Sequence, residues 1–66
     1  MKNFSLIVKQ LSRSENRFID IRPIRTNNIL YVRYVIREIV RKKNISLSDL
    51  KVFDMITGEE YSVYSF

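Results

Sequence analysis

The sequence contains no cysteine and no histidine, and it has only one glycine and one proline. The absence of cysteine excludes disulfide bonds, and zinc sites built on cysteine or histidine are excluded with them. General acid–base catalysis near neutral pH most often uses histidine, and one glycine cannot form a glycine-rich phosphate loop. The sequence therefore predicts no metal centre and no cofactor.

The remaining nucleophiles and carboxylates do not form a reactive arrangement either. None of the seven serines lies in a G-x-S-x-G motif, and no histidine is present to activate one. Glu59 and Glu60 are adjacent, so in a strand their side chains would point to opposite faces and could not act as a glycosidase pair. We expect a binding protein and not an enzyme.

Long hydrophobic runs are also missing. The apolar run that begins at Phe4 stops at Lys9, which is too short for a signal-peptide core and for a membrane span. We therefore expect an intracellular, cytoplasmic protein that does not contact membranes.

A chain of 66 residues corresponds to a single domain, residues 1–66. A chain of this length buries only about 60% of its unfolded surface. Without disulfides or metal, its stability must come from a good core or from a partner chain. The apolar fraction of 45% is enough for a core, and the charged fraction of 29% argues against a disordered chain.

The first third of the chain reads as a β-hairpin. Residues 3–11 and 17–24 show the patterns of strands, and the polar segment 12–16 between them is short enough for antiparallel pairing. Pro23 cannot donate a ladder hydrogen bond, so the second strand ends there or lies at a sheet edge.

A helix is predicted for residues 28–43. Residues 26–28 are Thr-Asn-Asn, whose side chains can cap a helix start, and Asn44 suits a left-handed residue at the helix end. At about 100° per residue, one arc of the helix is apolar. This expected core arc contains Ile29, Val32, Val35, Ile36, Ile39 and Val40.

The last third reads as two further strands, residues 51–54 and 59–66, after a polar connection at residues 46–50. A turn at residues 55–58 places Gly58 where a positive φ is expected. The order of elements is ββαββ. The predicted fold is α+β, with one helix packed on an antiparallel or mixed four-stranded sheet.

Strict alternation places apolar residues on both faces of the predicted strands. In the second strand, it puts Ile19 and Ile21 on one face and Phe18 and Ile24 on the other. One helix covers only one face of a sheet. The second face would be covered by a partner chain, by a self-dimer or by strand addition at an edge, or it would stay partly exposed.

The charge is unevenly distributed along the chain, whose net charge is +5. Residues 1–43 hold 11 lysines and arginines and 3 acidic residues, which gives 11 − 3 = +8. Residues 44–66 hold 1 lysine and 4 acidic residues, which gives 1 − 4 = −3. A basic segment of this kind favours an acidic partner.

Arginines recur every four residues on the predicted helix. The side of the helix opposite the core arc contains Leu30, Arg33, Tyr34, Arg37 and Arg41. Such a stripe is either the solvated face of a helix, supported by ion pairs of Glu38 with the basic residues that follow it, or a contact surface. Two like-charge pairs at i,i+4, and an exposed leucine and tyrosine between the arginines, count against a purely solvated face. Singly exposed apolar residues are normal, however, so both interpretations stay open.

Two functions fit these features. The first is a non-enzymatic binding module that acts by protein–protein interaction, as an adaptor or inhibitor. The richness in isoleucine and asparagine is typical of AT-rich genomes, and it fits a protein of a phage or mobile element. The alternative is a sequence-nonspecific nucleic-acid-binding protein that uses the helix stripe with Arg17, Arg22 and Arg25 of the second strand. No RRM, KH, zinc-finger or helix-turn-helix pattern is present to support the alternative.

Overall fold

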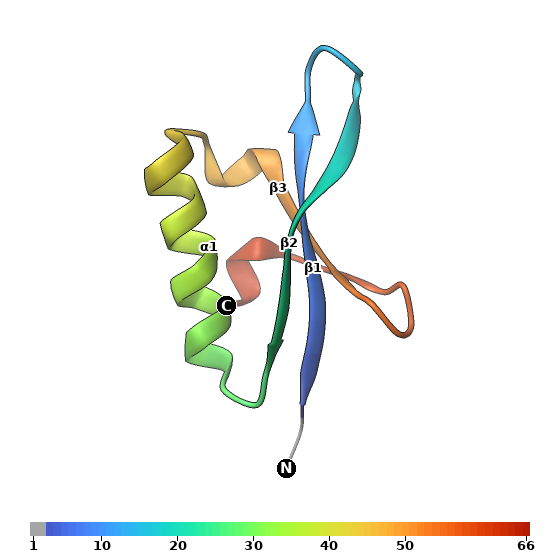
Figure 1. Ribbon diagram of the computed structural model, residues 1–66, viewed down its shortest axis with the longest axis vertical. Helices are drawn as coiled ribbons and strands as arrows, with labels where there is room; N and C mark the ends of the chain where they lie inside the picture. The colour runs from blue at the N-terminus through green and yellow to red at the C-terminus, as the bar shows by residue number, and fades with distance from the viewer. Residues whose placement is uncertain (1–2) are drawn as a thin grey trace.

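A computed structural model of the protein describes residues 3–66 and shows one long helix lying on a small sheet (Figure 1). The elements are β1 (Phe4–Ser12), β2 (Arg17–Thr26), α1 (Ile29–Lys43), β3 (Leu50–Asp54) and β4 (Glu60–Tyr61), with 3-10 helices at Leu47–Asp49 and Val63–Ser65. All strand pairs are antiparallel, and the spatial order is β2-β1-β3-β4. The predicted α+β fold is confirmed. Within residues 3–66, no helix is both long and apolar enough to cross a membrane.

The ends of α1 follow from its capping residues. Asn28 is the N-cap, and its side-chain oxygen accepts a hydrogen bond of 2.9 Å from the backbone N–H of Leu30. Asn44 ends the helix in the left-handed conformation, with φ of 52°, and its N–H donates to the carbonyl of Val40. The predicted helix is therefore confirmed, together with both of its caps.

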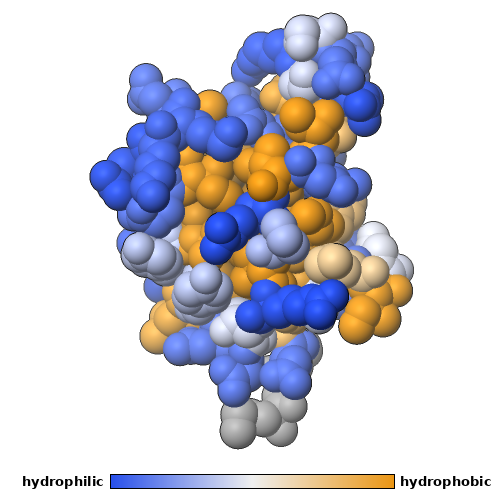
Figure 2. Space-filling model, viewed as in Figure 1, coloured by the Kyte–Doolittle hydropathy of each residue, from blue (hydrophilic) through white to orange (hydrophobic). Residues whose placement is uncertain are grey.

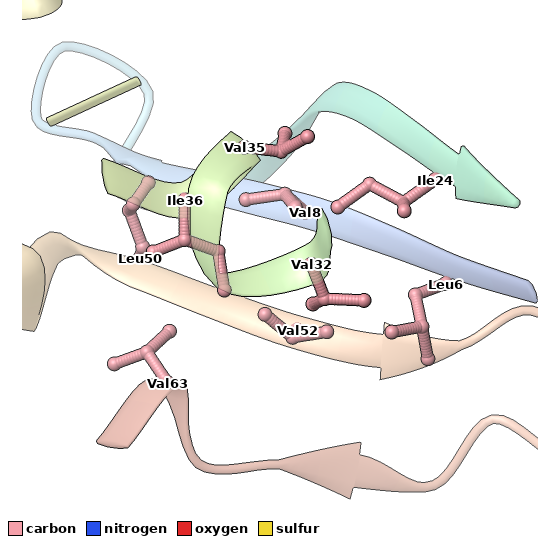
Figure 3. Packing of buried hydrophobic residues seen from close by; sticks show 9 residues of the cluster. All are labelled: Leu6, Val8, Ile24, Val32, Val35, Ile36, Leu50, Val52 and Val63. Atoms are coloured by element: carbon pink, nitrogen blue, oxygen red, sulfur yellow. The ribbon is translucent and has the colours of Figure 1, made fainter. Parts of the chain in front are cut away.

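The core lies between α1 and one face of the sheet (Figure 3). Its buried side chains are Leu6, Val8, Ile24, Val32, Val35, Ile36, Leu50, Val52 and Val63. Most of the expected core arc of α1 packs here, but Ile29 is 40% exposed and the prediction for it was wrong. Side chains on a helix lean toward its N-terminus, so that of the first residue extends past the helix end instead of onto the sheet.

A β-bulge changes which residues of β2 face the helix. The pairing shifts between Val8 and Lys9, which lie opposite Arg22 and Asp20, so Ile21 is an extra residue in β2. Ile21 packs against the core, and the Arg22 side chain also points to the helix side, toward Tyr31 of α1.

Strict alternation therefore fails in β2. The prediction that Phe18 and Ile24 lie on the same face of the sheet was wrong. Ile24 lies opposite Leu6 and is buried under α1. Phe18 lies opposite Leu11, on the other side of the bulge and on the far face of the sheet. One extra residue reverses the parity on which alternation depends.

The C-terminal segment was predicted as a strand over residues 59–66, and this was wrong beyond Tyr61. Within residues 59–66, only Glu60 and Tyr61 pair with β3. The chain then turns into the 3-10 helix, capped by Ser62, and Val63 becomes part of the core. Burial of Val63 outweighs the strand preference of this aromatic-rich segment, because a continued strand would leave that end of the core uncovered.

The β3–β4 turn has the expected geometry. Gly58 has φ of 76°, as predicted. The Asp54 carboxylate accepts hydrogen bonds from the N–H groups of Ile56 and Thr57, at 2.7 and 3.0 Å, which stabilises the turn. The turn projects from the sheet on the side away from α1 (Figure 1).

Candidate functional site

The exposed side of α1 brings five of the predicted site residues together. We call this surface the outer face of α1; it consists of Leu30, Arg33, Tyr34, Arg37 and Arg41. Spacings of three and four residues place these side chains next to one another on a helix. Leu30 and Tyr34 are 60% and 59% exposed, and the three arginines are exposed as well.

The three arginines of the outer face differ in their partners. Arg41 donates to both oxygens of Glu38, at 2.8 and 3.0 Å, and Lys42 lies 3.7 Å from the same carboxylate. The hydrogen bond from Arg41 lowers the pKa of Glu38, and Glu38 in turn raises the pKa of Arg41. Arg33 and Arg37 form no ion pair within residues 3–66. The free positive charge of the outer face therefore lies at these two residues.

The three arginines of β2 are not brought together. Arg17 lies at the β1–β2 turn and pairs with Glu15 at 2.9 Å. Arg25 lies opposite Ser5 of β1, and Arg22 is the one that reaches α1, 3.5 Å from the Tyr31 hydroxyl. Of the predicted strand residues, only Arg22 is therefore adjacent to the helix.

Two clefts run along α1. The first, of about 250 Å³, separates α1 from β2 and is lined by Tyr34 and Val35 on the helix and by Arg22 on the strand. The second, of about 210 Å³, lies between Arg33 and Arg37 of α1 and the C-terminal segment. Figure 2 shows apolar surface between α1 and the sheet, with strongly hydrophilic side chains over the C-terminal half of α1.

The first cleft contains Tyr31, Lys42 and Lys43, which the sequence reasoning missed as site residues. The ring of Tyr31 stacks on that of the predicted residue Tyr34, with 6.4 Å between ring centroids, and the two lysines lie at the end of the same cleft. The i,i+3 spacing of the two tyrosines is visible in the sequence and predicts that they are neighbours on a helix. The position of Arg22 opposite them is not visible there, because it depends on the bulge.

The far face of the sheet is covered in part by its own lysines. The ammonium groups of Lys9 and Lys51 lie 4.9 and 4.6 Å from the ring centroids of Phe53 and Phe18. Each lysine also pairs with a carboxylate of a neighbouring strand, at 3.5 and 3.9 Å. The lysine side chains shield the rings from water. A homodimer through this face stays a prediction, but it would cover less apolar surface than strand alternation suggests.

Comparisons of the chain with models of protein families, with curated proteins and with solved structures find no match. Within residues 3–66, no group of three acidic side chains is arranged to hold a metal ion. The chemistry of the exposed surfaces is therefore the guide to function.

Proposed function

We propose that this protein is a non-enzymatic binding module, an adaptor or inhibitor, that binds an acidic protein surface through the outer face of α1. The observation that carries this proposal is the pair of exposed arginines Arg33 and Arg37, which form no ion pair within residues 3–66 and lie beside the exposed side chains of Leu30 and Tyr34.

The composition of this surface supports a protein partner. Arginine and tyrosine are the residue types enriched at interface hot spots, and an exposed leucine adds apolar area that a partner can bury. The like-charge pairs Arg33–Arg37 and Arg37–Arg41 each cost an isolated helix roughly 0.2–0.5 kcal/mol. Carboxylates of a partner would offset this repulsion when they pair with the guanidinium groups.

The far face of the sheet is less suited to bind a partner than the outer face of α1. Its two lysines, Lys9 and Lys51, already contact carboxylates and aromatic rings of this chain. A partner at that face would have to break these contacts. A partner at the outer face of α1 meets two arginines that form no ion pair within the described part of the chain.

The test compares two triple variants with the same net charge. One replaces Arg33, Arg37 and Arg41 with Gln, and the control replaces Arg13, Arg17 and Arg25 with Gln, away from α1. Partners are captured from a nuclease-treated native lysate, and dissociation rates are measured on the purified partner. We expect faster dissociation from the first variant only, because close charge pairs act mainly on the dissociation rate. Equal binding by the parent and both variants would contradict the proposal.

Nucleic-acid binding is a second candidate, favoured by the number of unpaired cations. Within residues 3–66, the cations without an ion pair are Arg22, Arg25, Arg33, Arg37 and Lys43. Phosphate contacts require only clustered positive charge. A gel shift with random duplex and single-stranded oligonucleotides at two salt concentrations tests this candidate. Binding that weakens steeply with salt, and in both triple variants alike, would favour nucleic acid over protein.

A further inference from the structure

Two separate surfaces of this molecule, the cleft between α1 and β2 and the β3–β4 turn, combine apolar side chains with charges of opposite sign. We propose that the cleft between α1 and β2 binds the β3–β4 turn of a second copy of this chain, with Ile56 as the inserted side chain. This self-association goes beyond the proposed function, because its cleft lies between α1 and β2 and shares only Tyr34 with the outer face of α1.

The cleft has the size and lining for one apolar side chain. Its volume is about 250 Å³, and Val35, Ile39, Tyr31 and Tyr34 contribute apolar surface to it. Pockets for small-molecule ligands are usually larger, about 300–1,000 Å³. The cleft is therefore large enough to hold one large apolar side chain.

The rim of the cleft is positively charged. Arg22, Lys42 and Lys43 line it together with one acid, Glu38, which gives a local charge of 3 − 1 = +2. Arg22 forms no ion pair among the described residues, and its contact with the Tyr31 hydroxyl is long, 3.5 Å. An occupant that brings carboxylates beside an apolar side chain would form ion pairs with the basic residues of this rim.

The β3–β4 turn has this chemistry. Ile56 is 83% exposed and Met55 is 46% exposed, so two large apolar side chains stand next to each other in water. Three acids flank them, Asp54, Glu59 and Glu60, and residues 52–66 contain no lysine or arginine. Counted together with Lys51, which lies 3.9 Å from Glu60, the turn presents an apolar tip with a local charge of 1 − 3 = −2, opposite in sign to the rim of the cleft.

The placement of the two features favours contact between copies over contact within one chain. The turn projects from the sheet on the side away from α1, and apolar surface is visible at its tip (Figures 1 and 2). The tip of one copy would bind the cleft of the next, head to tail. Such contacts join different surfaces and do not close on a pair, so the assembly grows with concentration. The contact area is small, so the association is weak.

The test uses sedimentation with two variants and a matched control for each. Arg22→Glu reverses the charge of the rim, and Arg25→Glu makes the same charge change on β2 outside the cleft. Ile56→Ser removes the apolar tip, and Tyr64→Ser removes an exposed apolar side chain that belongs neither to the cleft nor to the outer face of α1. All four positions are exposed, and circular dichroism checks that each variant folds.

We expect the parent to show concentration-dependent association at tens to hundreds of micromolar. Arg22→Glu and Ile56→Ser should each weaken it by at least about tenfold, the loss expected when a central contact is removed. The two controls should associate like the parent. The proposal is overturned if the parent stays monomeric over this range. It is also overturned if Arg25→Glu weakens the self-association as much as Arg22→Glu does.

A mixing experiment tests the head-to-tail geometry directly. The Arg22→Glu chain keeps its tip, and the Ile56→Ser chain keeps its cleft. Mixed together, the two should form a 1:1 heterodimer that grows no further, although each alone is monomeric. A mixture that stays monomeric overturns the proposal. This outcome does not depend on Arg33 or Arg37, so it leaves the proposed function of the outer face unaffected.

Discussion

Glu38 shows how one side chain divides the arginines of α1 into two kinds. It holds Arg41 at 2.8 Å and Lys42 at 3.7 Å, so both cations are partly neutralised. Arg33 and Arg37 have no such partner in residues 3–66. Arginine recurs regularly every four residues in the sequence, but the positive charge at the surface is uneven, because Glu38 partly neutralises Arg41.

The carboxyl group of Glu38 should titrate below the ordinary range for glutamate, because the hydrogen bond from Arg41 lowers its pKa. A depressed pKa means that Glu38 contributes stability above the ordinary glutamate pKa, and that this contribution is lost as the pH falls through the lowered value. NMR titration of the side-chain carbon measures this pKa. In Arg41→Gln it should move back up, and an unchanged pKa would show that Arg41 is not the cause.

Ile36 tests the core at the level of one residue. It is buried, and it packs with Val32 and Val35 between α1 and the sheet. Replacing it with Ala should lower the free energy of unfolding by ~2–5 kcal/mol, because a cavity opens in the core. The exposed Leu30→Ala serves as control, with a change of about 0.5 kcal/mol or less. Urea unfolding measures both, and equal losses would mean that α1 does not pack as described.

At the level of the element, α1 is held by packing more than by its own propensity. Its core side is rich in valine and isoleucine, which lose side-chain freedom in a helix. The caps at Asn28 and Asn44 determine where it begins and ends, but burial of the core side against the sheet stabilises it. The outer face is therefore free to serve binding.

Replacing Arg33, Arg37 and Arg41 together with Gln should change stability little. The change removes two like-charge repulsions and one attraction to Glu38. These contributions oppose one another, so the free energy of unfolding should stay within about 1 kcal/mol of the parent value. Thermal and urea unfolding measure it. A large loss would mean that the outer face supports the fold and is not a surface reserved for a partner.

At the scale of the whole molecule, the two faces of the sheet are protected from water in different ways. Only one face of the sheet is covered by a helix, and the far face relies on Lys9 and Lys51 to shield Phe53 and Phe18. In a chain of 66 residues this arrangement limits the apolar surface left in water.

Replacing Lys9 and Lys51 with Ser should therefore expose the two aromatic rings. We expect increased fluorescence of a neutral hydrophobic dye such as Nile red, measured on the folded variant. The control replaces Arg13 and Lys43 with Ser, which removes the same charge from exposed positions that cover no aromatic ring in the described part of the chain. Equal dye binding by the two variants would show that the lysines do not shield the far face.

The sequence by itself determined the local features of this protein. The caps of α1, the positive φ of Gly58 and the exposure of the arginine stripe all depend on residues within a few positions of one another. Helical spacing, capping and turn chemistry are local, so they can be read in order along the chain.

Only the tertiary structure decided the features that depend on contacts between distant segments. The bulge opposite Val8 sends Ile24 and Arg22 to the helix side and leaves Phe18 on the far face, and the core draws Val63 out of the strand pattern. A bulge is a property of two paired strands, so alternation counted along one strand cannot detect it. The cleft between Arg22 and Tyr31 exists for the same reason: one extra residue in β2 turns an arginine toward a helix that lies beyond it in the sequence.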